Sequence, residues 1–213
     1  MSQVPTATTA NYPDRTVCGV AKLWVDGVGA FLVCFDSQVR IGGAGSTPGA
    51  KPEIALMSNL SRSHLRIVRS GEVWLVEPLG PTSIDERPIA RPSLLNDGNL
   101  LRLGTTVKLR FRLPSVLSGT ACLEFESSHR PNPSVDGIIL FAEMCVLSSK
   151  LDAHISLREG SDTVILTRRS NGLWCQAREG VSVEGVAQEA EVRCEIGKVY
   201  SGPNWRFRLE AVV

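Results

Sequence analysis

The stretch "TVKLRFRL", residues 106–113, carries the clearest periodicity in the chain. Apolar residues occupy every second position from Val107 to Leu113, and basic residues occupy the positions between them. Alternation with a period of two places successive side chains on opposite faces of a strand. The stretch therefore predicts a half-buried β-strand with a basic outer face.

Further strands are predicted ahead of this one. The sequence "HLRIVRSGEVWLVEP" (64–78) predicts a hairpin that turns at Ser70 and Gly71, and "GAFLVCFDSQVRIGG" (29–43) is also rich in strand formers. Nineteen glycines and twelve prolines interrupt the chain at the spacing typical of a sandwich or barrel. We expect an all-β fold with mainly antiparallel strands.

The second half of the sequence repeats the first in the same order. "RSGEVWLVE" (69–77) matches "RSNGLWCQA" (169–177), which sets Trp74 opposite Trp174. "EIAL" (53–56) resembles "HISL" (154–157), and "RFRL" occurs at 110–113 and at 206–209. Such ordered matches indicate two copies of one β domain.

A break in the alternation separates the two copies. The stretch "LPSVLSGTA" (113–121) predicts a boundary at residues 114–119, where the apolar Val116 and Leu117 favour a fixed interface over a free linker. We predict a flexible lead-in over residues 1–13, a first β-sandwich over 14–116 and a second, more diverged sandwich over 117–213.

Composition excludes several classes of protein. Apolar residues make up 43% of the chain and charged residues 21%, and the formal net charge is +1, so no global field draws the chain to nucleic acid or to acidic membranes. No run approaches the ~18 apolar residues of a membrane span. The N-terminal residues have neither the basic nor the apolar region of an export signal. We expect a cytoplasmic protein that does not bind membranes.

The six cysteines contain no C-x-x-C pair. This spacing disfavours a zinc site, and a reducing compartment favours free, buried thiols. We expect no metal and no cofactor.

A polar motif precedes one of the predicted strands. In "NLSRSHLRIV" (59–68), Ser61, Arg62 and His64 stand directly before an alternating apolar run. These residue types fit the polar rim of a strand, a catalytic group or a cradle for an anion. The motif alone does not choose between the three.

The surrounding order of motifs resembles a forkhead-associated (FHA) domain. That family shows "I-G-R", "S-R-x-H", a hairpin, "G-T-x-V-N-G" and "L-x-x-G-D-x-L-x-L-G". Here residues 39–104 contain "VRIGG", "LSRSH", "VWLVEP", "PTSIDE" and "LLNDGNLLRLG". The resemblance extends over most of residues 17–114. It implies a sandwich of two twisted sheets that binds phosphothreonine peptides through loops at one end.

The resemblance assigns roles to individual residues. Ser61 falls on the serine that binds phosphate, and Arg62 follows it, where it contacts phosphate or braces the loop. Gly42 and His64 fall on positions that support the shape of the site. Thr82 keeps the threonine of the peptide-binding turn.

Two departures from the family pattern weaken the implied site. Gly43 replaces the family arginine, and a hydrogen bond to a charged group contributes about 1.5–3 kcal/mol, or roughly 10- to 100-fold in affinity. Arg40 and Lys51 are the candidate substitutes. Gly80 and Pro81 replace the family Asn-Gly, and proline cannot adopt the positive φ of that turn.

The second copy departs further from the family. Ser161 aligns with Ser61, while Asp162 replaces the arginine and Val164 the histidine. An aspartate would repel phosphate. We therefore expect this copy to keep the scaffold and to lack the phosphate site.

Two functions remain open at this point. The first is a non-catalytic adaptor for phosphothreonine peptides in serine/threonine kinase signalling, with a phosphothreonine-containing protein or kinase substrate as partner. The second is a phosphate-independent scaffold that binds a protein or a second copy of itself.

Catalysis and nucleic-acid binding are disfavoured. Ser61 and His64 stand three residues apart in no established triad order, and no G-x-S-x-G, P-loop or HExxH motif occurs. The remaining histidines, His129 and His154, are isolated in the sequence. Basic strand residues are interpreted as a solvated outer face. They are Arg110, Arg112, Arg206 and Arg208.

Overall fold

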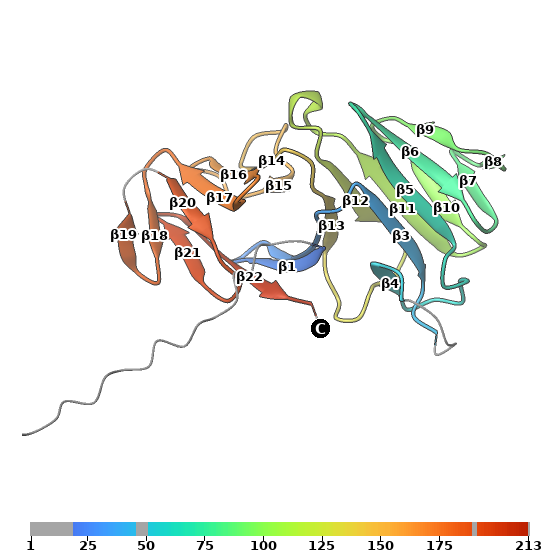
Figure 1. Ribbon diagram of the computed structural model, residues 1–213, viewed down its shortest axis with the longest axis horizontal. Helices are drawn as coiled ribbons and strands as arrows, with labels where there is room; N and C mark the ends of the chain where they lie inside the picture. The colour runs from blue at the N-terminus through green and yellow to red at the C-terminus, as the bar shows by residue number, and fades with distance from the viewer. Residues whose placement is uncertain (1–18, 46–50, 189–190, 213) are drawn as a thin grey trace, which may run out of the picture.

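The computed structural model describes residues 19–45, 51–188 and 191–212, and β-strands dominate this part of the chain (Figure 1). Its single helical element is a short 3-10 turn, η1 (Val116–Ser118). The predicted all-β fold is confirmed. Within the described residues, no helix is long and apolar enough to cross a membrane.

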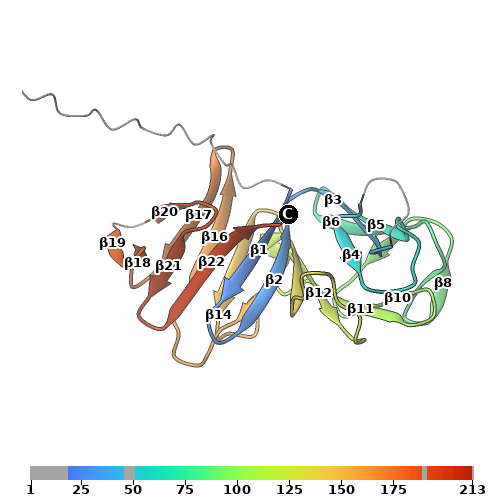
Figure 2. The ribbon, with the colours of Figure 1, turned by 90° about the horizontal axis from the view of Figure 1, so that it is seen from below.

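Twelve strands pair into one long sheet that runs through the whole molecule (Figures 1 and 2). In the order in which they pair, they are β19 (Val186–Gln188), β18 (Val181–Val183), β21 (Val199–Gly202), β22 (Trp205–Ala211), β1 (Val20–Val25), β2 (Gly29–Cys34), β13 (Gly137–Leu140), β12 (Ala121–Phe125), β11 (Val107–Arg112), β10 (Leu100–Leu103), β7 (Thr82–Ile84) and β8 (Arg87–Ile89).

Two five-stranded sheets complete the fold. One contains β4 (Ile54–Leu56), β3 (Gln38–Gly43), β5 (Leu65–Ser70), β6 (Val73–Pro78) and β9 (Ser93–Leu95). The other contains β15 (Ile155–Ser156), β14 (Met144–Ser148), β16 (Val164–Arg169), β17 (Gly172–Ala177) and β20 (Glu191–Cys194).

Each small sheet packs on one half of the long sheet and encloses its own hydrophobic core. The first sandwich is formed by the β4-β3-β5-β6-β9 sheet and the second by the β15-β14-β16-β17-β20 sheet. Most strand pairs are antiparallel, and β2 with β13, β3 with β4 and β14 with β15 are parallel. The prediction of two sandwiches with mainly antiparallel strands is confirmed.

The two sandwiches repeat one topology. The order β4-β3-β5-β6-β9 in the first corresponds to β15-β14-β16-β17-β20 in the second. Likewise, β12-β11-β10-β7-β8 corresponds to β1-β22-β21-β18-β19. The second correspondence brings together strands from opposite ends of the chain.

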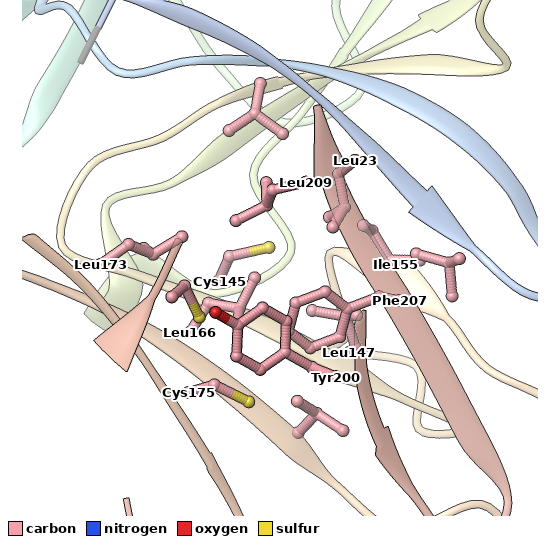
Figure 3. Close-up of a cluster of buried hydrophobic side chains, with 14 of the residues drawn as sticks. Leu23, Cys145, Leu147, Ile155, Leu166, Leu173, Cys175, Tyr200, Phe207 and Leu209 are labelled. Carbon is pink, nitrogen blue, oxygen red and sulfur yellow. The ribbon is translucent and has the colours of Figure 1, made fainter. Parts of the chain in front are cut away.

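The hairpin that begins each copy completes the sandwich of the other copy. β1 pairs with β22, the last strand in the described part of the chain, with Leu23 beside Leu209. β12 pairs with β11, with Leu123 beside Phe111. Figure 3 shows Leu23 packed near Leu209 and Phe207 in the second core. We call this arrangement the hairpin exchange.

The hairpin exchange joins the two sandwiches through β2 and β13. These strands run parallel at the centre of the long sheet, and Leu32 pairs with Ile138 and Val33 with Ile139. Leu32 and Ile138 belong to the first core, whereas Val33 and Ile139 belong to the second. Because both faces of these strands are buried, "GIIL" is apolar without alternation, as expected for a strand between two layers.

The predicted boundary at residues 114–119 falls in the connection between β11 and β12, two strands that pair with each other. A cut there would separate neighbouring strands of one sheet. The domain limits 14–116 and 117–213 stay a prediction, and the lead-in 1–13 lies outside the described residues.

The structure corrects the register of the sequence repeat by one residue. β5 and β16 share nearly the same burial pattern, which sets Leu65 level with Val164 and His64 level with Thr163. Trp74 pairs with Arg69, and its equivalent Leu173 pairs with Arg168. The matches of Trp74 with Trp174 and of His64 with Val164 were therefore wrong. A slip of one residue exchanges the two faces of a strand, which is why Trp74 is buried and Trp174 is half-exposed.

Candidate functional site

The Ser61 motif lies in the loop between β4 and β5, at one end of the first sandwich (Figure 1). Backbone hydrogen bonds fix this loop on two sides. Gly43 N donates to Ser61 O (3.0 Å) and His64 N to Ile41 O (2.9 Å), which ties the loop to β3. Gly80 N donates to His64 O (2.8 Å), which ties it to the turn before β7.

Glycines at the end of β3 allow the loop to approach closely. A Cβ added at Gly42 would lie 1.8 Å from Arg62 O, and one added at Gly43 would lie 2.4 Å from Leu60 O. Both neighbours are backbone atoms, which cannot move aside cheaply. The position of the family arginine is therefore closed by the loop itself, and any side chain there requires a different loop path.

His64 bridges the loop to the turn before β7. Its ring is 4% exposed, and Nε2 lies 2.8 Å from Pro81 O. Because a carbonyl only accepts, Nε2 carries a proton and donates it to Pro81 O. Gly80 packs against the same ring, where a Cβ would lie 2.7 Å from Nδ1. These contacts support a structural role for His64.

Ser61 is exposed, and its hydroxyl faces the loop's own polar atoms. Oγ lies 3.2 Å from Ser63 O and 3.3 Å from His64 Nδ1. The structure thus brings Ser61 and His64 together, as a catalytic pair would require. However, the far nitrogen of the imidazole donates to the Pro81 carbonyl rather than to a carboxylate, so the third member of a triad is replaced by backbone.

Thr82 and Arg40 are already engaged within the protein. Thr82 is 6% exposed, and its Oγ1 donates to Gly80 O at 2.9 Å. Arg40 donates from Nε and Nη2 to the two carboxylate oxygens of Glu53, at 3.2 and 2.8 Å. The hydrogen bond and charge of Glu53 raise the pKa of Arg40. A ligand would have to displace these partners, so peptide contacts by Thr82 and Arg40 stay predictions.

Two cations line a pocket of about 260 Å³ beside the loop. They are Arg62, whose Nη2 donates to Gly45 O at 2.6 Å, and Lys51. No carboxylate is among the described residues that line this pocket. The sequence named both cations, but it did not indicate that they would share a pocket.

The same pocket contains residues that the sequence did not indicate. Met57 and Asn132 both line it. Asn132 lies between β12 and β13, in the hairpin that begins the second copy, and Met57 N donates to Arg130 O at 2.8 Å in the same connection. Only the hairpin exchange brings this connection to the first sandwich, so no local sequence signal could identify it.

The equivalent loop of the second sandwich, between β15 and β16, carries an acid. Asp162 accepts from Thr163 N (2.7 Å) and from Glu179 N (2.8 Å). Ser161 donates its hydroxyl to Asn204 O at 3.1 Å. These side chains satisfy backbone groups of the loop and of the turns before β18 and β22, and a carboxylate stands where an anion would otherwise approach.

The basic residues on the outer strand faces are paired with acids. Arg110 contacts Glu126 at 2.5 Å and Arg112 contacts Asp97 at 3.0 Å. Arg206 lies 3.3 Å from Asp26, and Arg208 lies 3.4 Å from Glu210. The pairs neutralise the faces that a nucleic acid would require to be positive.

The five described cysteines are free and buried, as predicted. They are Cys34, Cys122, Cys145, Cys175 and Cys194. Burial raises the pKa of the Cys122 thiol to about 12, so it stays protonated and poorly nucleophilic near neutral pH. Cys18 lies outside the described residues. The described chain contains no group of three or more histidine, cysteine or acidic side chains that could hold a metal.

Comparison with known proteins gives one structural similarity. The chain is similar to a solved structure described as "Rv0020c_FHA Structure", with 24% identity and a TM-score of 0.26, over 40% of this chain and 84% of that one. No protein-family profile and no curated protein matches the chain.

Proposed function

We propose that this chain is a non-catalytic adaptor that binds phosphothreonine peptides at the β4–β5 loop, in serine/threonine kinase signalling. The observation that carries the proposal is the pocket lined by Lys51 and Arg62 next to the exposed Ser61. Its described lining contains two cations and no carboxylate. The order of FHA-like motifs in the sequence supports the same function.

The chemistry of the pocket suits a phosphate monoester. A phosphothreonine carries about −1.5 to −2 charges and three strong acceptor oxygens. A guanidinium offers a fork of donors and an ammonium offers a compact charge, so Arg62 and Lys51 would together neutralise the ester. In this arrangement Lys51 replaces the family arginine, because Gly43 is closed by the loop backbone.

The geometry of Ser61 and His64 supports binding rather than catalysis. No described carboxylate orients the imidazole, because its Nε2 is held by the Pro81 carbonyl. The Ser61 hydroxyl can still donate to a phosphate oxygen after rotation about Cβ–Oγ. We assign Ser61 this accessory role.

The test uses the intact chain and a fluorescent phosphothreonine peptide library. Matched unphosphorylated peptides measure selectivity. We expect Lys51→Gln and Arg62→Gln each to weaken binding by about 10- to 100-fold, because each removes a charge-assisted contact. Ser61→Ala should lower the affinity for the phosphopeptide by about 3- to 10-fold, which corresponds to the loss of one neutral hydrogen bond.

The control is Arg91→Gln, which removes the same charge from an exposed loop residue outside the pocket. It should change affinity less than twofold. Thermal unfolding of each variant separates lost binding from lost folding. Equal binding of phosphorylated and unphosphorylated peptides by the folded chain would rule out the proposal.

A phosphate-independent scaffold is the second candidate, and specific contacts favour it. The Ser61 hydroxyl already faces Ser63 O and His64 Nδ1, and Arg40 is bound by Glu53. In that case the loops would bind a protein partner directly. Peptide binding that is insensitive to phosphate and to Lys51→Gln would support this function instead.

A further inference from the structure

A second cleft, of about 400 Å³, lies between the two sandwiches, away from the Ser61 loop. The chain crosses from one sandwich to the other here, after β2 and again after β13. Phe35 and Phe141 come from the two crossing segments, and their ring centroids lie 5.2 Å apart. Both side chains are buried and line the cleft.

Equivalent residues of the two copies meet across this cleft. Arg69 N donates to Ser37 O (2.8 Å), and Arg168 N donates to Glu143 O (2.9 Å). Arg69 and Arg168 occupy the same position in β5 and β16. The cleft is therefore formed by residues of both sandwiches, and neither sandwich could form it alone.

The lining of the cleft is rich in arginine. Arg69, Arg168 and Arg169 face one lining carboxylate, that of Glu143. Glu143 lies 3.0 Å from Arg69, and Arg169 is paired with Glu191 at 2.6 Å. Arg168 donates to the Phe35 carbonyl, and no described carboxylate pairs with it. The cleft keeps an uncompensated positive charge.

Arg69 adds an independent observation. Its side chain is 17% exposed, and its Nε is buried without a hydrogen-bond partner in the described part of the chain. Buried donors without an acceptor are rare in folded proteins. An arginine with an unused donor, lining a positively charged cleft, favours a ligand that supplies oxygen acceptors.

We propose that this cleft binds an acidic segment of a protein partner, through a carboxylate or phosphate group held by Arg168 and Arg69. The buried phenylalanines exclude water from the floor, which strengthens charged hydrogen bonds. Glu143 competes with the ligand for Arg69. This site is separate from the Ser61 loop and does not depend on the function proposed for that loop.

A polypeptide fits the cleft better than a nucleic acid. Nucleic-acid binding uses several cations spaced along a strand of phosphates. Here one uncompensated arginine lies in a confined cleft, and the exposed arginines of β11 and β22 are paired with acids. One or two acidic groups on a peptide match this distribution of charge.

The experiment measures binding of fluorescein-labelled decapeptides to the intact chain. A Glu-Gly repeat peptide is the first probe, a Gln-Gly repeat is its neutral match, and a Gln-Gly repeat with one phosphoserine distinguishes phosphate from carboxylate. We expect one or both anionic peptides to bind and the neutral peptide not to bind. The tighter anionic peptide identifies the source of the oxygen atoms.

Two variants should change affinity in opposite directions. Arg168→Gln should weaken binding about tenfold, and Glu143→Gln should tighten it about threefold by releasing Arg69. Arg208→Gln and Glu210→Gln are the matched controls, because they make the same charge changes in a surface pair on β22. Each control should shift affinity less than twofold.

Several outcomes would overturn the proposal. They are absence of binding by both anionic peptides at millimolar concentration, equal effects of Arg168→Gln and Arg208→Gln, and tighter binding of a single-stranded oligonucleotide with the same dependence on Arg168. If Arg168→Gln impairs folding, the gain predicted for Glu143→Gln still decides the question.

Discussion

The β4–β5 loop of the first sandwich and the β15–β16 loop of the second occupy the same place in the fold. Each is tied by one side chain to a neighbouring turn, the one before β7 in the first sandwich and the one before β18 in the second. In the first, His64 Nε2 donates to Pro81 O, and in the second, Asp162 accepts from Glu179 N. The donor and acceptor roles are reversed, but the connection is the same. A hydrogen bond from the loop to the neighbouring turn is therefore a structural feature that both sandwiches share. The sign of the nearby charge distinguishes the two loops.

The comparison separates residues that hold the loop in place from residues whose charge could bind a ligand. Arg62 in the first loop and Lys51 in the adjacent connection before β4 make this region positive, while the second loop carries the acidic Asp162. A histidine in a motif that resembles a binding site thus performs a task that a carboxylate performs in the neighbouring copy. Four experiments test how far the comparison between the sandwiches extends.

Separating the two sandwiches should have the largest effect. Residues 14–116 alone lack β12 and β13, whose Leu123, Ile138 and Leu140 are fully buried in the first core. Each such leucine or isoleucine contributes about 2–5 kcal/mol against alanine, so the fragment should show no cooperative unfolding in urea. The matched fragment 37–142 contains β3 to β13 and should keep a cooperative transition. A stably folded 14–116 monomer would contradict the hairpin exchange.

Placing an arginine at the end of the third strand of each copy should be harmful in the first and harmless in the second. Gly43→Arg places a Cβ against Leu60 O and should cost about 3 kcal/mol of unfolding free energy. Ser149, the equivalent residue in the second sandwich, is exposed, so Ser149→Arg should stay within about 0.5 kcal/mol. Urea denaturation measures both. Equal costs would show that the close approach at Gly43 is not the cause.

Removing the two ties should lower stability by smaller amounts. His64→Ala removes the hydrogen bond between the buried imidazole and Pro81 O. It should lower the unfolding free energy by about 2 kcal/mol. Asp162→Ala, at a more exposed site, should cost about 1 kcal/mol. Asp162→Asn keeps an acceptor oxygen and should recover part of that loss. If His64→Ala is neutral, the bridge to Pro81 does not stabilise the fold.

The smallest effect is a pH dependence confined to the second sandwich. His154 is buried, its Nδ1 accepts from Val146 N at 3.0 Å, and its Nε2 lies 2.8 Å from the Ser118 hydroxyl. Burial lowers its pKa from the ordinary 6.5. The unfolded state therefore binds a proton more readily than the folded state.

The consequence for stability has a definite sign. The contribution of neutral His154 is complete above about pH 6.5 and is lost as pH falls below that value toward the lower folded pKa. Thermal unfolding between pH 7.5 and 5 should show this loss. His154→Gln, which cannot titrate, should flatten that part of the profile, and an unchanged slope in the variant would assign the effect to other groups.

The sequence could predict the strands but not all of their partners. Alternation identified β11 and the β5–β6 hairpin because one face of each strand is buried. In β1 the apolar residue types favour burial of Leu23, but they do not indicate which of the two similar cores covers it. The one-residue error between Trp74 and Trp174 has a related cause, since equal residue types in a short match do not define which face they share.

At the candidate site, too, the local sequence predicts some contacts but not those with distant parts of the chain. Ser61 and His64 lie in contact, as expected for two residues that are three positions apart in one loop, while their roles in binding stay a prediction. The pocket also uses Asn132, which reaches it through the hairpin exchange. Contacts made by a strand's distant partner have no signature in the local sequence.

The hairpin exchange also sets an order of events during synthesis. Trp24 on β1 donates to Glu210 on β22 across 186 positions of the chain, at 2.8 Å. β1 therefore cannot pair with β22 until Trp205–Ala211 has left the ribosome. Until then it exposes an unpaired edge, which favours slow folding and association with other chains. β1 is therefore translated long before the strand that completes its pairing.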